Sequence, residues 1–518
     1  MAAHQEIELK LRVDPERLAR LQRSRWWRGL GPARRESLHS IYFDTPDHDL
    51  RDGNITMRTR SDGKGIVQTV KLKQDPSDSV SRSEWETIIP DSIPDPSLVI
   101  DPTLPSAFRR LTSADLQPVF EIDVKRQTRR LRSEQAQIDI SLDDGTAAAG
   151  EARESIHEVE LELIEGDIEA LFAVAQRLSD SIGGRLHMRT KSDVGYGLIV
   201  PERRHWSRAP QLRLTPEMSA NESFRLIVLS AFSHLTANDD CARLNLHVEG
   251  VHQCRIALRR LRSAFKIYGP FLSRKRIRAI DEDIRWLGQI LGTARDLDVL
   301  QTELIEPAME SLGDDEDLSP LLANLAGKKA AAYAQVGQAL GSERYRHLLI
   351  ALCGLAYNGN IAKTDREAEL EQPLDRFAAT ALSHLHRRLL KRGHGFESLS
   401  KEERHEVRIA LKRLRYAVDF FASIFDSERK GKFFKRLSRL QDDLGGMNDV
   451  AVAETMLMRL IGVGETADSA TSPSGNGKLV FAAGAILGWH RRRASEINRE
   501  LIKDWHAFVQ AKPFWLQS

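Results

Sequence analysis

Charged residues stand at every second position in several short segments of the first 200 residues. Residues 6–10 read Glu-Ile-Glu-Leu-Lys, and residues 158–162 read Glu-Val-Glu-Leu-Glu. Successive side chains of a strand point to opposite faces, so each segment places its charges on one face and its apolar residues on the other. Three further segments share the pattern: Arg58–Arg60, Lys71–Lys73 and Arg82–Glu86.

A solvated face explains a single strand of this kind, because charged side chains are mostly exposed. Five such strands favour a closed antiparallel barrel, which has no sheet edges and gathers the charged faces in one lumen. Carboxylates in such a lumen suit a hard divalent cation, and the arginines and lysines suit phosphate groups. The residue set therefore indicates metal-assisted transfer of a phosphoryl group to water.

The same part of the chain reads mostly as short strands divided by Pro, Gly and Asp clusters. The predicted strands are Glu6–Val13, Ile55–Arg60, Ile66–Lys73, Glu84–Ile89, Val119–Gln127, Gln137–Leu142 and His157–Ile164. Two helices are predicted, Pro15–Trp27 and Ile168–Ile182. Beyond about residue 218, apolar residues recur with a helical period and strand signals are few. We therefore predict an α+β multidomain protein with an antiparallel eight-stranded β tunnel and a C-terminal all-α domain.

The charge of the chain divides in the same way. Of 518 residues, the first 200 contain 28 basic and 34 acidic side chains, and the remaining residues contain 48 and 40. The difference predicts two domains with different ligands. We place the tunnel domain at residues 1–200, a linker at 201–217 and the helical domain at 218–510. The helical domain reads as two repeats, at about 218–340 and 370–510.

Cysteine spacing and hydropathy predict a location. The three cysteines lack the CxxC spacing of a zinc or redox site, which favours a reducing compartment. The first residues have no apolar signal core, and the apolar stretches fall short of the ~20 residues of a spanning helix. We expect a cytoplasmic protein without a membrane partner; the oligomeric state is not predicted.

Residues 5–200 resemble the CYTH domain, the family of triphosphate tunnel metalloenzymes. The signature ExExK stands at Glu6, Glu8 and Lys10. The matching segments that follow are YFDT at 42–45, MRTR with Arg58 and Arg60, QTVKLK with Lys71 and Lys73, RSEWE with Arg82, IDISLDDG with Asp139 and Asp143, EVELELIEG, and KSDVGYG with Lys191. The ordered set covers nearly 200 residues, which makes the resemblance specific.

The resemblance implies an eight-stranded tunnel that binds a linear triphosphate with Mg²⁺ or Mn²⁺. Its catalytic residues would be Glu6, Glu8 and Lys10. Its metal ligands would be Glu6 and Glu8, with help from Glu158, Glu160 and Glu162. The residues that would hold phosphates are Arg58, Arg60, Lys71, Arg82, Lys125, Arg126 and Lys191.

One strand departs from the family pattern. After Pro118 the family usually has basic residues, whereas this chain reads VFEIDVKR, with acids at Glu121 and Asp123. We take Lys125 and Arg126 as the retained cations. The two acids would weaken binding of a phosphate chain or recruit a second metal, so they bear on substrate preference more than on fold.

The helical half contains an internal duplication. The pattern H-x-x-R-I-A-L-[RK]-R-L-R occurs at His252 and again at His405. The string LGTARD begins 39 residues after His252, and LGGMND begins 39 residues after His405. Because the offsets are equal, we infer two copies of one helical unit.

Each copy places a row of cations along one helix. Positions 0, 3, 7, 10 and 14 share one stripe at 100° per residue. The first stripe is His252, Arg255, Arg259, Arg262 and Lys266, and the second is His405, Arg408, Lys412 and Arg415. A row of like charges repels itself, so the stripes indicate an external polyanion. The alternative is a solvated face or one paired between helices, with Asp296 and Asp449 as partners.

Residues from about 218 to 510 resemble the CHAD domain, a helical module with two basic repeats that often follows CYTH. The doubled motif is specific to that family. The resemblance implies binding of inorganic polyphosphate and association with polyphosphate granules. Nucleic acid fits less well, because few aromatic residues interleave with the cations and no groove-reading motif is present.

The sequence thus predicts a metal-dependent inorganic triphosphatase with a polyphosphate-binding helical domain. One alternative is a polyphosphate-binding adaptor with an idle tunnel. Another is a tunnel enzyme for an organic triphosphate, of the adenylate cyclase or thiamine triphosphatase type. A scaffold of two charged domains without a ligand is the remaining alternative.

Overall fold

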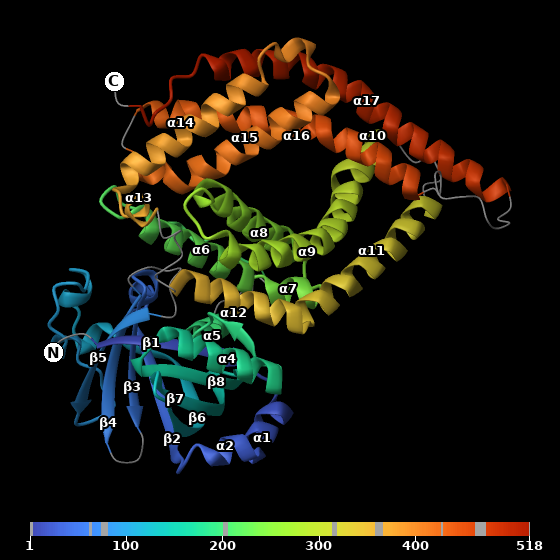
Figure 1. Cartoon of the computed structure of the whole chain (residues 1–518). Helices are drawn as coiled ribbons and strands as arrows, with labels where there is room; N and C mark the ends of the chain where they lie inside the picture. Colours follow the sequence, from blue (N-terminus) through green and yellow to red (C-terminus); the bar gives the residue numbers. More distant parts are fainter. Residues whose placement is uncertain are drawn as a thin grey trace. The chain divides into compact units, whose positions relative to one another are not determined.

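The structure is a computed structural model, and it describes residues 4–61, 65–73, 81–199, 206–312, 319–357, 366–425, 428–460 and 473–516. The chain divides into two compact units. The first comprises residues 1–212, 228–240 and 340–361, and the second comprises 213–227, 241–339 and 362–518. Figure 1 shows the strands in the first unit and helices throughout the second.

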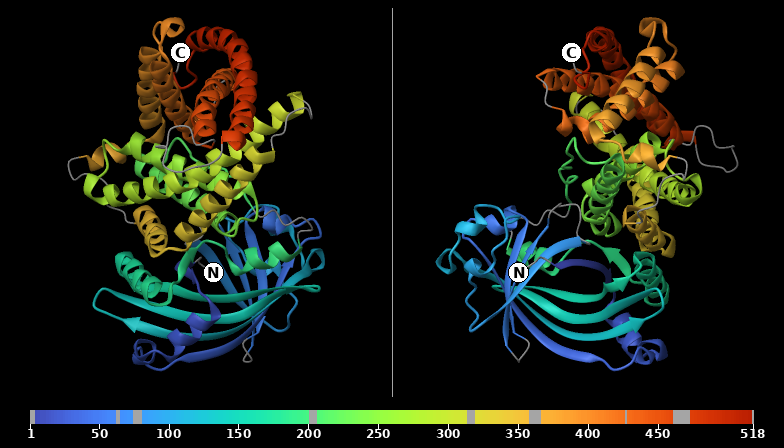
Figure 2. Two further views of the ribbon diagram at one scale, coloured as in Figure 1. Left: turned by 90° about the vertical axis from the view of Figure 1, so that its right-hand side faces the viewer. Right: turned by 60° about the vertical axis from the view of Figure 1, so that its left-hand side comes forward.

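The strands of the first unit form one antiparallel sheet. They are β1 (His4–Arg12), β2 (Arg34–Asp44), β3 (Ile55–Ser61), β4 (Ile66–Leu72), β5 (Ser81–Ile89), β6 (Gln117–Arg132), β7 (Ala136–Ala149), β8 (Ala152–Gly166) and β9 (Arg185–His187). Their order is β5-β4-β3-β2-β6-β7-β8-β1-β9, and residues 4–7 of β1 also pair with β5. This last pairing links eight strands in a ring, and Figure 2 shows the long strands curving together. The predicted fold class is confirmed.

Both faces of the ring are covered. In β1, Leu9 and Leu11 are buried on one face, while Glu8 and Lys10 are buried on the other at 6% and 7% exposure. The helix α4 (Ile168–Ile182) contacts β1, β7 and β8 from outside. Because the charged face is also buried, it is not an ordinary solvated face, and the charges lie inside the ring.

The remaining helices of the first unit pack around this ring. They are α1 (Pro15–Arg23), α2 (Arg25–Gly29), α3 (Asp49–Asp52), α5 (Lys191–Ile199), α12 (Glu343–Tyr357) and the short turns η1 (Pro96–Leu98), η2 (Phe108–Arg110) and η3 (Ser113–Asp115). The predicted helix Ile168–Ile182 is present with the same bounds as α4. Asp167 caps its start by accepting from the Glu169 amide, and Gly183 ends it with φ of 65°.

Several details differ from the sequence prediction, which also lacked α3, β9 and α5. The predicted helix Pro15–Trp27 is two helices, because Ser24 is extended and accepts a hydrogen bond from the Trp27 amide, which starts α2. β2 had not been predicted as a strand. β7 continues past Leu142 to Ala149, because strands pair with it on both sides. Gly145 allows this approach, since a Cβ there would lie 2.1 Å from the Asp123 carbonyl oxygen of β6.

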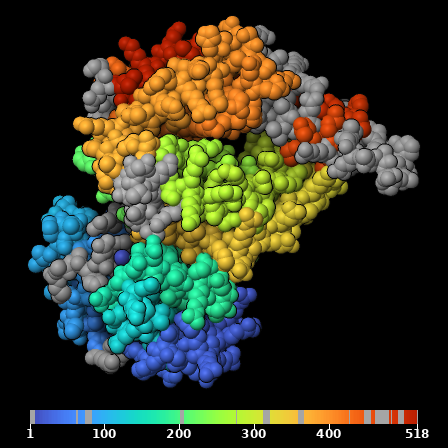
Figure 3. Space-filling view, viewed as in Figure 1, coloured from blue at the N-terminus to red at the C-terminus, as the bar shows by residue number. Residues whose placement is uncertain are grey.

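The second unit is helical in its described part. Its helices are α8 (Val248–Tyr268), α9 (Arg274–Val299), the π-helical turn η4 (Leu300–Ile305), α10 (Glu306–Leu312), α11 (Ser319–Gly341), α13 (Glu367–Leu370), α14 (Leu374–Arg392), η5 (Phe396–Ser398), α15 (Lys401–Phe421), η6 (Ala422–Ile424), α16 (Arg429–Leu460) and α17 (Pro473–Val509). The helices α6 (Ala220–Thr236) and α7 (Asp239–Arg243) have residues in both units. Side chains fill the spaces between neighbouring ribbons (Figure 3).

The duplicated motif forms two matching helices. α8 and α15 are each 21 residues long, and each begins four residues before the first histidine of its motif. A longer helix follows each of them, α9 in the first copy and α16 in the second, and α8 contacts α15. Their aromatic side chains meet in the core, where the Tyr268 ring of α8 lies 6.4 Å from the Phe421 ring of α15 and stacks on Phe377 of α14 at 4.7 Å.

Candidate functional site

A cavity of about 520 Å³ lies inside the ring of strands of the first unit. Eight basic and five acidic residues line it, so its lining has an excess of positive charge. The basic ones are Lys10, Arg34, Arg58, Arg60, Lys71, Lys73, Arg126 and Lys191, and the acidic ones are Glu8, Glu84, Glu86, Glu160 and Glu162. A cavity with this lining suits an anion that carries several charges.

Three buried carboxylates gather at one wall of the ring. Asp143 lies on β7, and Glu158 and Glu160 are alternate residues of β8, so all three face inward. They are 0%, 5% and 8% exposed, and one oxygen from each lies within 4.8 Å of the others. Three hard oxygen donors at this spacing can hold a divalent cation such as Mg²⁺ or Mn²⁺.

Basic side chains neutralise these carboxylates. Lys191 Nζ lies 2.7 Å from Asp143 Oδ2 and 2.7 Å from Glu160 Oε1, and it also pairs with Glu158. Arg126 donates two bonds to Asp143, at 2.8 and 2.6 Å, and one to Glu160. Lys10 pairs with Glu160 and with Glu8.

The pKa values of the cluster follow from this pairing. Burial alone raises the pKa of Glu160, but Arg126, Lys10 and Lys191 lower it well below its ordinary value. Glu158 behaves in the same way: Lys191 outweighs the effect of burial and holds its pKa at about 2. Burial lowers the pKa of Lys191, but the three carboxylates raise it well above its ordinary value. All of these groups are therefore charged at neutral pH.

The opposite wall carries cations with few acidic partners. Arg58 is 8% exposed and donates to the Tyr42 hydroxyl at 3.3 Å, and Arg60 donates to Ser40 Oγ at 3.4 Å. Among the described residues, Arg58 Nε is buried without a hydrogen-bond partner, and neither arginine forms an ion pair. Burial, followed by repulsion from Arg58 and Arg126, lowers the pKa of Arg60 to about 10. Such a pair of arginines suits a bound anion.

Most of the residues predicted for the tunnel are brought together by the structure. The cavity lining includes Glu8, Lys10, Arg58, Arg60, Lys71, Arg126, Lys191, Glu160 and Glu162, and Glu158 lies just behind it. The side chains of Glu6 and Arg82 lie outside the described residues, although the two residues are paired between β1 and β5.

Lys125 does not join the group. It is exposed, whereas its neighbour Arg126 points into the cavity, because adjacent residues of β6 face opposite sides. Glu121 and Asp123 share the face of Lys125, and Asp123 Oδ1 lies 2.8 Å from His39 Nδ1. These acids therefore do not compete with a ligand in the cavity.

Asp143 was not among the predicted metal ligands, although it has the burial and partners of one. The signal that could have found it is the alternation Asp139, Ser141, Asp143, which places both acids on one face of β7. Arg34 also lines the cavity without having been predicted to do so, and Lys73, which the charge alternation placed in the lumen, lines it as well.

The first cationic stripe of the second unit is partly paired with α9. Arg255 lies 3.8 Å from Asp296, and Arg262 lies 3.7 Å from Asp281. Gly292 makes room for Arg255, because a Cβ there would lie 2.5 Å from its Nη1. Of the LGTARD string, Gly292 thus leaves space for Arg255, and Asp296 pairs with it. The side chain of Asp449, the equivalent in the second copy, lies outside the described residues.

Cations of the two copies come close where α8 contacts α15. Burial lowers the pKa of Lys266, and the charges of Arg413 and Arg262 lower it further. Burial and then the charge of Arg295 lower the pKa of His252. Arg259 Nε is buried without a hydrogen-bond partner in the described part of the chain.

The second stripe is more varied. Arg415 pairs with Asp419 at 3.0 Å, His405 is exposed, and Arg408 and Lys412 are half-buried. Ion pairs with acids thus hold Arg255, Arg262 and Arg415, while like charges of the two copies still crowd together around Lys266.

Comparison with known proteins identifies both parts of the chain. The CYTH domain family matches residues 4–194, and the CHAD domain family matches residues 226–458. The chain is therefore a CYTH–CHAD protein, with a CYTH domain followed by a CHAD domain.

Relatives are similar over different parts of the chain. The inorganic triphosphatase of Haemophilus influenzae is 28% identical over 175 residues, which is 34% of this chain and 49% of that protein. The chain thus matches about half the length of that relative. An uncharacterized protein of Mycobacterium tuberculosis is 25% identical over 408 residues, covering 74% of this chain and 75% of its own. The crystal structure of the CHAD domain from Ricinus communis is 29% identical, with a TM-score of 0.49, and covers 58% of this chain and 96% of that one.

Among the described helices, none is both long enough and apolar enough to cross a membrane.

Proposed function

We propose that the tunnel hydrolyses inorganic triphosphate with the help of a divalent cation, Mg²⁺ or Mn²⁺. The observation that carries the proposal is one cavity lined on one side by Glu160, which lies beside buried Asp143 and Glu158, and on the other by Arg58 and Arg60, which form no ion pair within the described part of the chain. The Haemophilus influenzae relative, an inorganic triphosphatase, is similar over the same part of the chain. Tripolyphosphate carries four to five negative charges at neutral pH, which matches a lining with eight basic and five acidic residues.

The carboxylate wall fits the metal. Asp143, Glu158 and Glu160 supply three oxygen donors, lowered pKa values keep Glu158 and Glu160 ionised at neutral pH, and Glu8 lies beside Lys10 at the edge of the group. Mg²⁺ and Mn²⁺ prefer such donors and commonly share phosphate oxygens with them. When bound, the metal would neutralise phosphate charge and lower the pKa of a bound water.

The side chains of the chain itself would bind and orient the substrate. Arg58 and Arg60 offer guanidinium groups to phosphate oxygens, and Lys71 of β4 and Lys73 just after it also line the cavity. Lys10 and Lys191 hold the carboxylates in place and lie between the two walls. Catalysis in such a site consists of positioning and of stabilising the charge that develops during the transfer.

The lining favours an inorganic over an organic triphosphate. In the described part of the chain, Tyr42 and Trp85 are the aromatic residues that line the cavity. The Tyr42 ring already stacks on Phe120 at 4.6 Å, and Trp85 is 3% exposed with its indole donating to Asp101 at 3.2 Å. Neither ring offers a free face to a nucleobase or a thiamine ring, and recognition of such groups depends on stacking.

We also propose that the helical unit binds inorganic polyphosphate along the stripes of α8 and α15. The crowding of Lys266, Arg262 and Arg413 supports this, since an added polyanion relieves the repulsion between them. Binding of polyphosphate by the helical unit would localise the protein to polyphosphate in the cytoplasm.

A substrate panel tests the tunnel proposal. Purified full-length protein is assayed for phosphate release from tripolyphosphate, ATP and thiamine triphosphate with Mg²⁺, with Mn²⁺ and with EDTA. We expect metal-dependent turnover of tripolyphosphate that exceeds turnover of the organic substrates, and its loss in Glu160→Gln and Glu8→Ala. Turnover of ATP to a cyclic product, with little release from tripolyphosphate, would instead establish the cyclase alternative. No turnover of any substrate, with polyphosphate binding retained, would establish the adaptor.

A further inference from the structure

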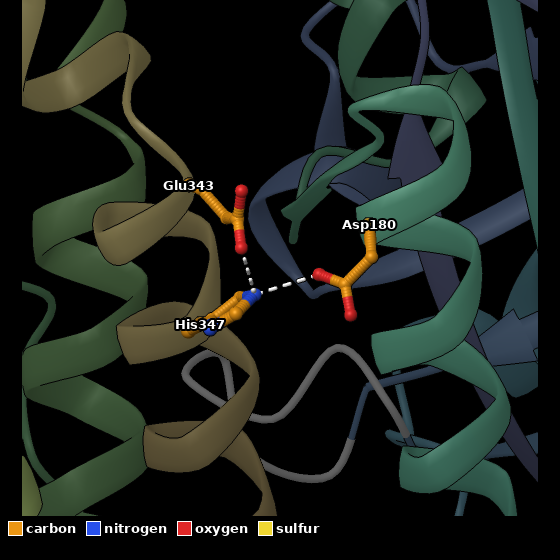
Figure 4. A group of neighbouring side chains, drawn as sticks. All are labelled: Asp180, Glu343 and His347. Atoms are coloured by element: carbon orange, nitrogen blue, oxygen red, sulfur yellow. Dashed lines mark hydrogen bonds and ion pairs between the residues drawn. The ribbon is translucent and has the colours of Figure 1, made fainter.

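Two segments that follow the tunnel in sequence belong to its compact unit. Residues 228–240 and 340–361 fall within the CHAD match, yet they pack with the strands. The second segment contains α12, which contacts α4 and β9. Figure 4 shows one attachment, where His347 of α12 points to Asp180 of α4. His347 Nε2 lies 2.6 Å from Asp180 Oδ1 and 3.7 Å from Glu343 Oε1.

A second attachment reaches the strands that carry the proposed site. Arg185 of β9 pairs with Asp240 at 2.6 Å and with Asp239 at 3.5 Å, and Arg12 of β1 pairs with Asp240 at 3.1 Å. Asp239 is 3% exposed and accepts a bond from the Tyr345 hydroxyl of α12 at 3.0 Å. The Arg185 side chain is 14% exposed, and the two aspartates raise its pKa above its ordinary value although burial lowers it. Both aspartates come from segment 228–240.

Apart from these ion pairs and its contact with α12, the strand β9 is held only weakly by the sheet. It is three residues long and pairs with β1 alone, through Lys10, Leu11 and Arg12. A strand of this length forms few backbone hydrogen bonds, so its position depends on its side chains. Leu186 is buried at 1% exposure, and Arg185 supplies the charged anchor on the opposite face.

The side chain of His187, on β9, also contacts the carboxylate cluster. His187 is paired with Lys10 across the strands, and its Nε2 lies 3.4 Å from Glu158 Oε2. Glu158 in turn pairs with Lys191 in the carboxylate wall. His187 does not line the cavity, so it can act on a ligand only through Glu158.

We infer that Arg185 is a positioning residue for the tunnel: held by Asp239 and Asp240, it fixes β9 so that His187 orients Glu158 toward the proposed metal. The inference rests on the proposed metal site. It assigns to segment 228–240 a role in the chemistry of the tunnel in addition to packing. Groups that orient a metal ligand typically change metal affinity about 10- to 100-fold when removed.

The experiment measures Mn²⁺ affinity of the full-length protein without substrate, by titration followed with electron paramagnetic resonance of the free ion and by calorimetry. The variants are Arg185→Gln, Arg185→Lys, the double variant Asp239→Asn/Asp240→Asn and His187→Gln. The matched control is Asp180→Asn, which removes the other attachment of α12 without touching β9. Thermal unfolding of each variant is recorded in parallel.

We expect Arg185→Gln, the double variant and His187→Gln to weaken Mn²⁺ binding about 10-fold. Arg185→Lys retains the charge and should restore part of the affinity. Asp180→Asn should lower the melting temperature and leave Mn²⁺ affinity within about 2-fold of the wild type. If Arg185→Gln misfolds, the double variant and His187→Gln carry the test.

Two results overturn the inference. One is wild-type affinity in Arg185→Gln and the double variant beside weak binding in Glu160→Gln, which leaves the proposed metal site standing. The other is equal weakening by Asp180→Asn, which would mean that general loosening of the unit explains the effect. Absence of Mn²⁺ binding by the wild type would overturn the proposed metal site and this inference with it.

Discussion

Lys191 Nζ lies 2.7 Å from Asp143 Oδ2, and the same ammonium group pairs with Glu158 and Glu160. One side chain thus neutralises the three carboxylates that we propose as metal ligands. A divalent cation and Lys191 therefore compete for the same oxygens. Replacement of Lys191 tests this competition.

Replacement of Lys191 by Gln should lower stability in EDTA, because three buried carboxylates lose a shared cation. The same variant should gain more from Mn²⁺ than the wild type does, so its melting temperature should rise further on adding the metal. Tripolyphosphate turnover should fall by about 100-fold, because a cation between the two walls is lost. Thermal unfolding with EDTA and with Mn²⁺ checks the first two effects. An unchanged response to Mn²⁺ would contradict the competition.

Replacement of Arg58 by Ala should reduce kcat/KM for tripolyphosphate by about 10- to 100-fold, the usual effect of losing a hydrogen bond to a charged group. Arg58→Lys should restore only part of this, because an ammonium group lacks the fork of donors. Lys125→Ala is the matched control, since Lys125 is an exposed cation of the same sheet, on β6, and its kinetics should equal those of the wild type. Loss of activity in Lys125→Ala would argue against the register of β6.

Acid should destabilise the tunnel unit through Glu158. Burial raises the pKa of this carboxyl, but Lys191 and His187 hold it at about 2, below the ordinary value. Ionised Glu158 therefore stabilises the fold above about pH 4.5, and the contribution, about 3 kcal/mol at most, is lost as the pH falls toward 2. Denaturant unfolding between pH 2 and 6 checks this. In Glu158→Gln the slope over that range should be smaller, and an identical slope would contradict the assignment.

The stability of the helical unit should depend on pH in the opposite direction through one residue, Asp443. Burial, together with a hydrogen bond and the charge of Asp504, raises the pKa of Asp443 to about 6. The protonated form is favoured in the folded state, so stability should increase as the pH falls through about 6 toward 4. Asp443→Asn should stabilise the protein at pH 8 by at most about 1 kcal/mol, because the pair is partly exposed to solvent. Melting temperatures at pH 5 and pH 8 test it, and destabilisation at pH 8 would refute it.

If the helical unit binds polyphosphate, substitutions in its stripes should weaken polyphosphate binding without changing tripolyphosphate hydrolysis. The double variant Arg259→Gln/Lys266→Gln should weaken binding of long-chain polyphosphate, by about 5-fold for each charge lost, at roughly 1 kcal/mol each. Hydrolysis of tripolyphosphate should not change. The control is Lys503→Gln, an exposed lysine that pairs with Glu500. Equal weakening in the control would show that total charge, and not the stripe, sets the affinity.

Alternation of charge was enough to predict the ring of strands and most of its lining. It could not decide between Lys125 and Arg126, because adjacent residues differ only in the face they occupy. That choice depends on the register of β6, which pairs Arg126 with Glu36 and with Asp143. Asp143 itself was seen as part of a motif, but its burial beside Glu160 arises from pairing between β7 and β8.

Contacts between residues that are far apart in the sequence could not be predicted from any local pattern. The pairing of Arg185 with Asp240 joins residues 55 positions apart, and that of His347 with Asp180 joins residues 167 apart. Each of these side chains is an ordinary charged residue in its own segment. Their roles follow from the packing of segment 228–240 against β9 and of α12 against α4, which no periodicity specifies.

The inclusion of segments 228–240 and 340–361 in the strand unit bears on how such a protein can arise and be altered. The two family segments are consecutive in the gene, but they are not interchangeable blocks. A helical half taken from another protein would have to bring residues that fit Arg185 and the face of α4, or the carboxylate strands would lose an anchor. The two halves must therefore be inherited, and engineered, as one piece.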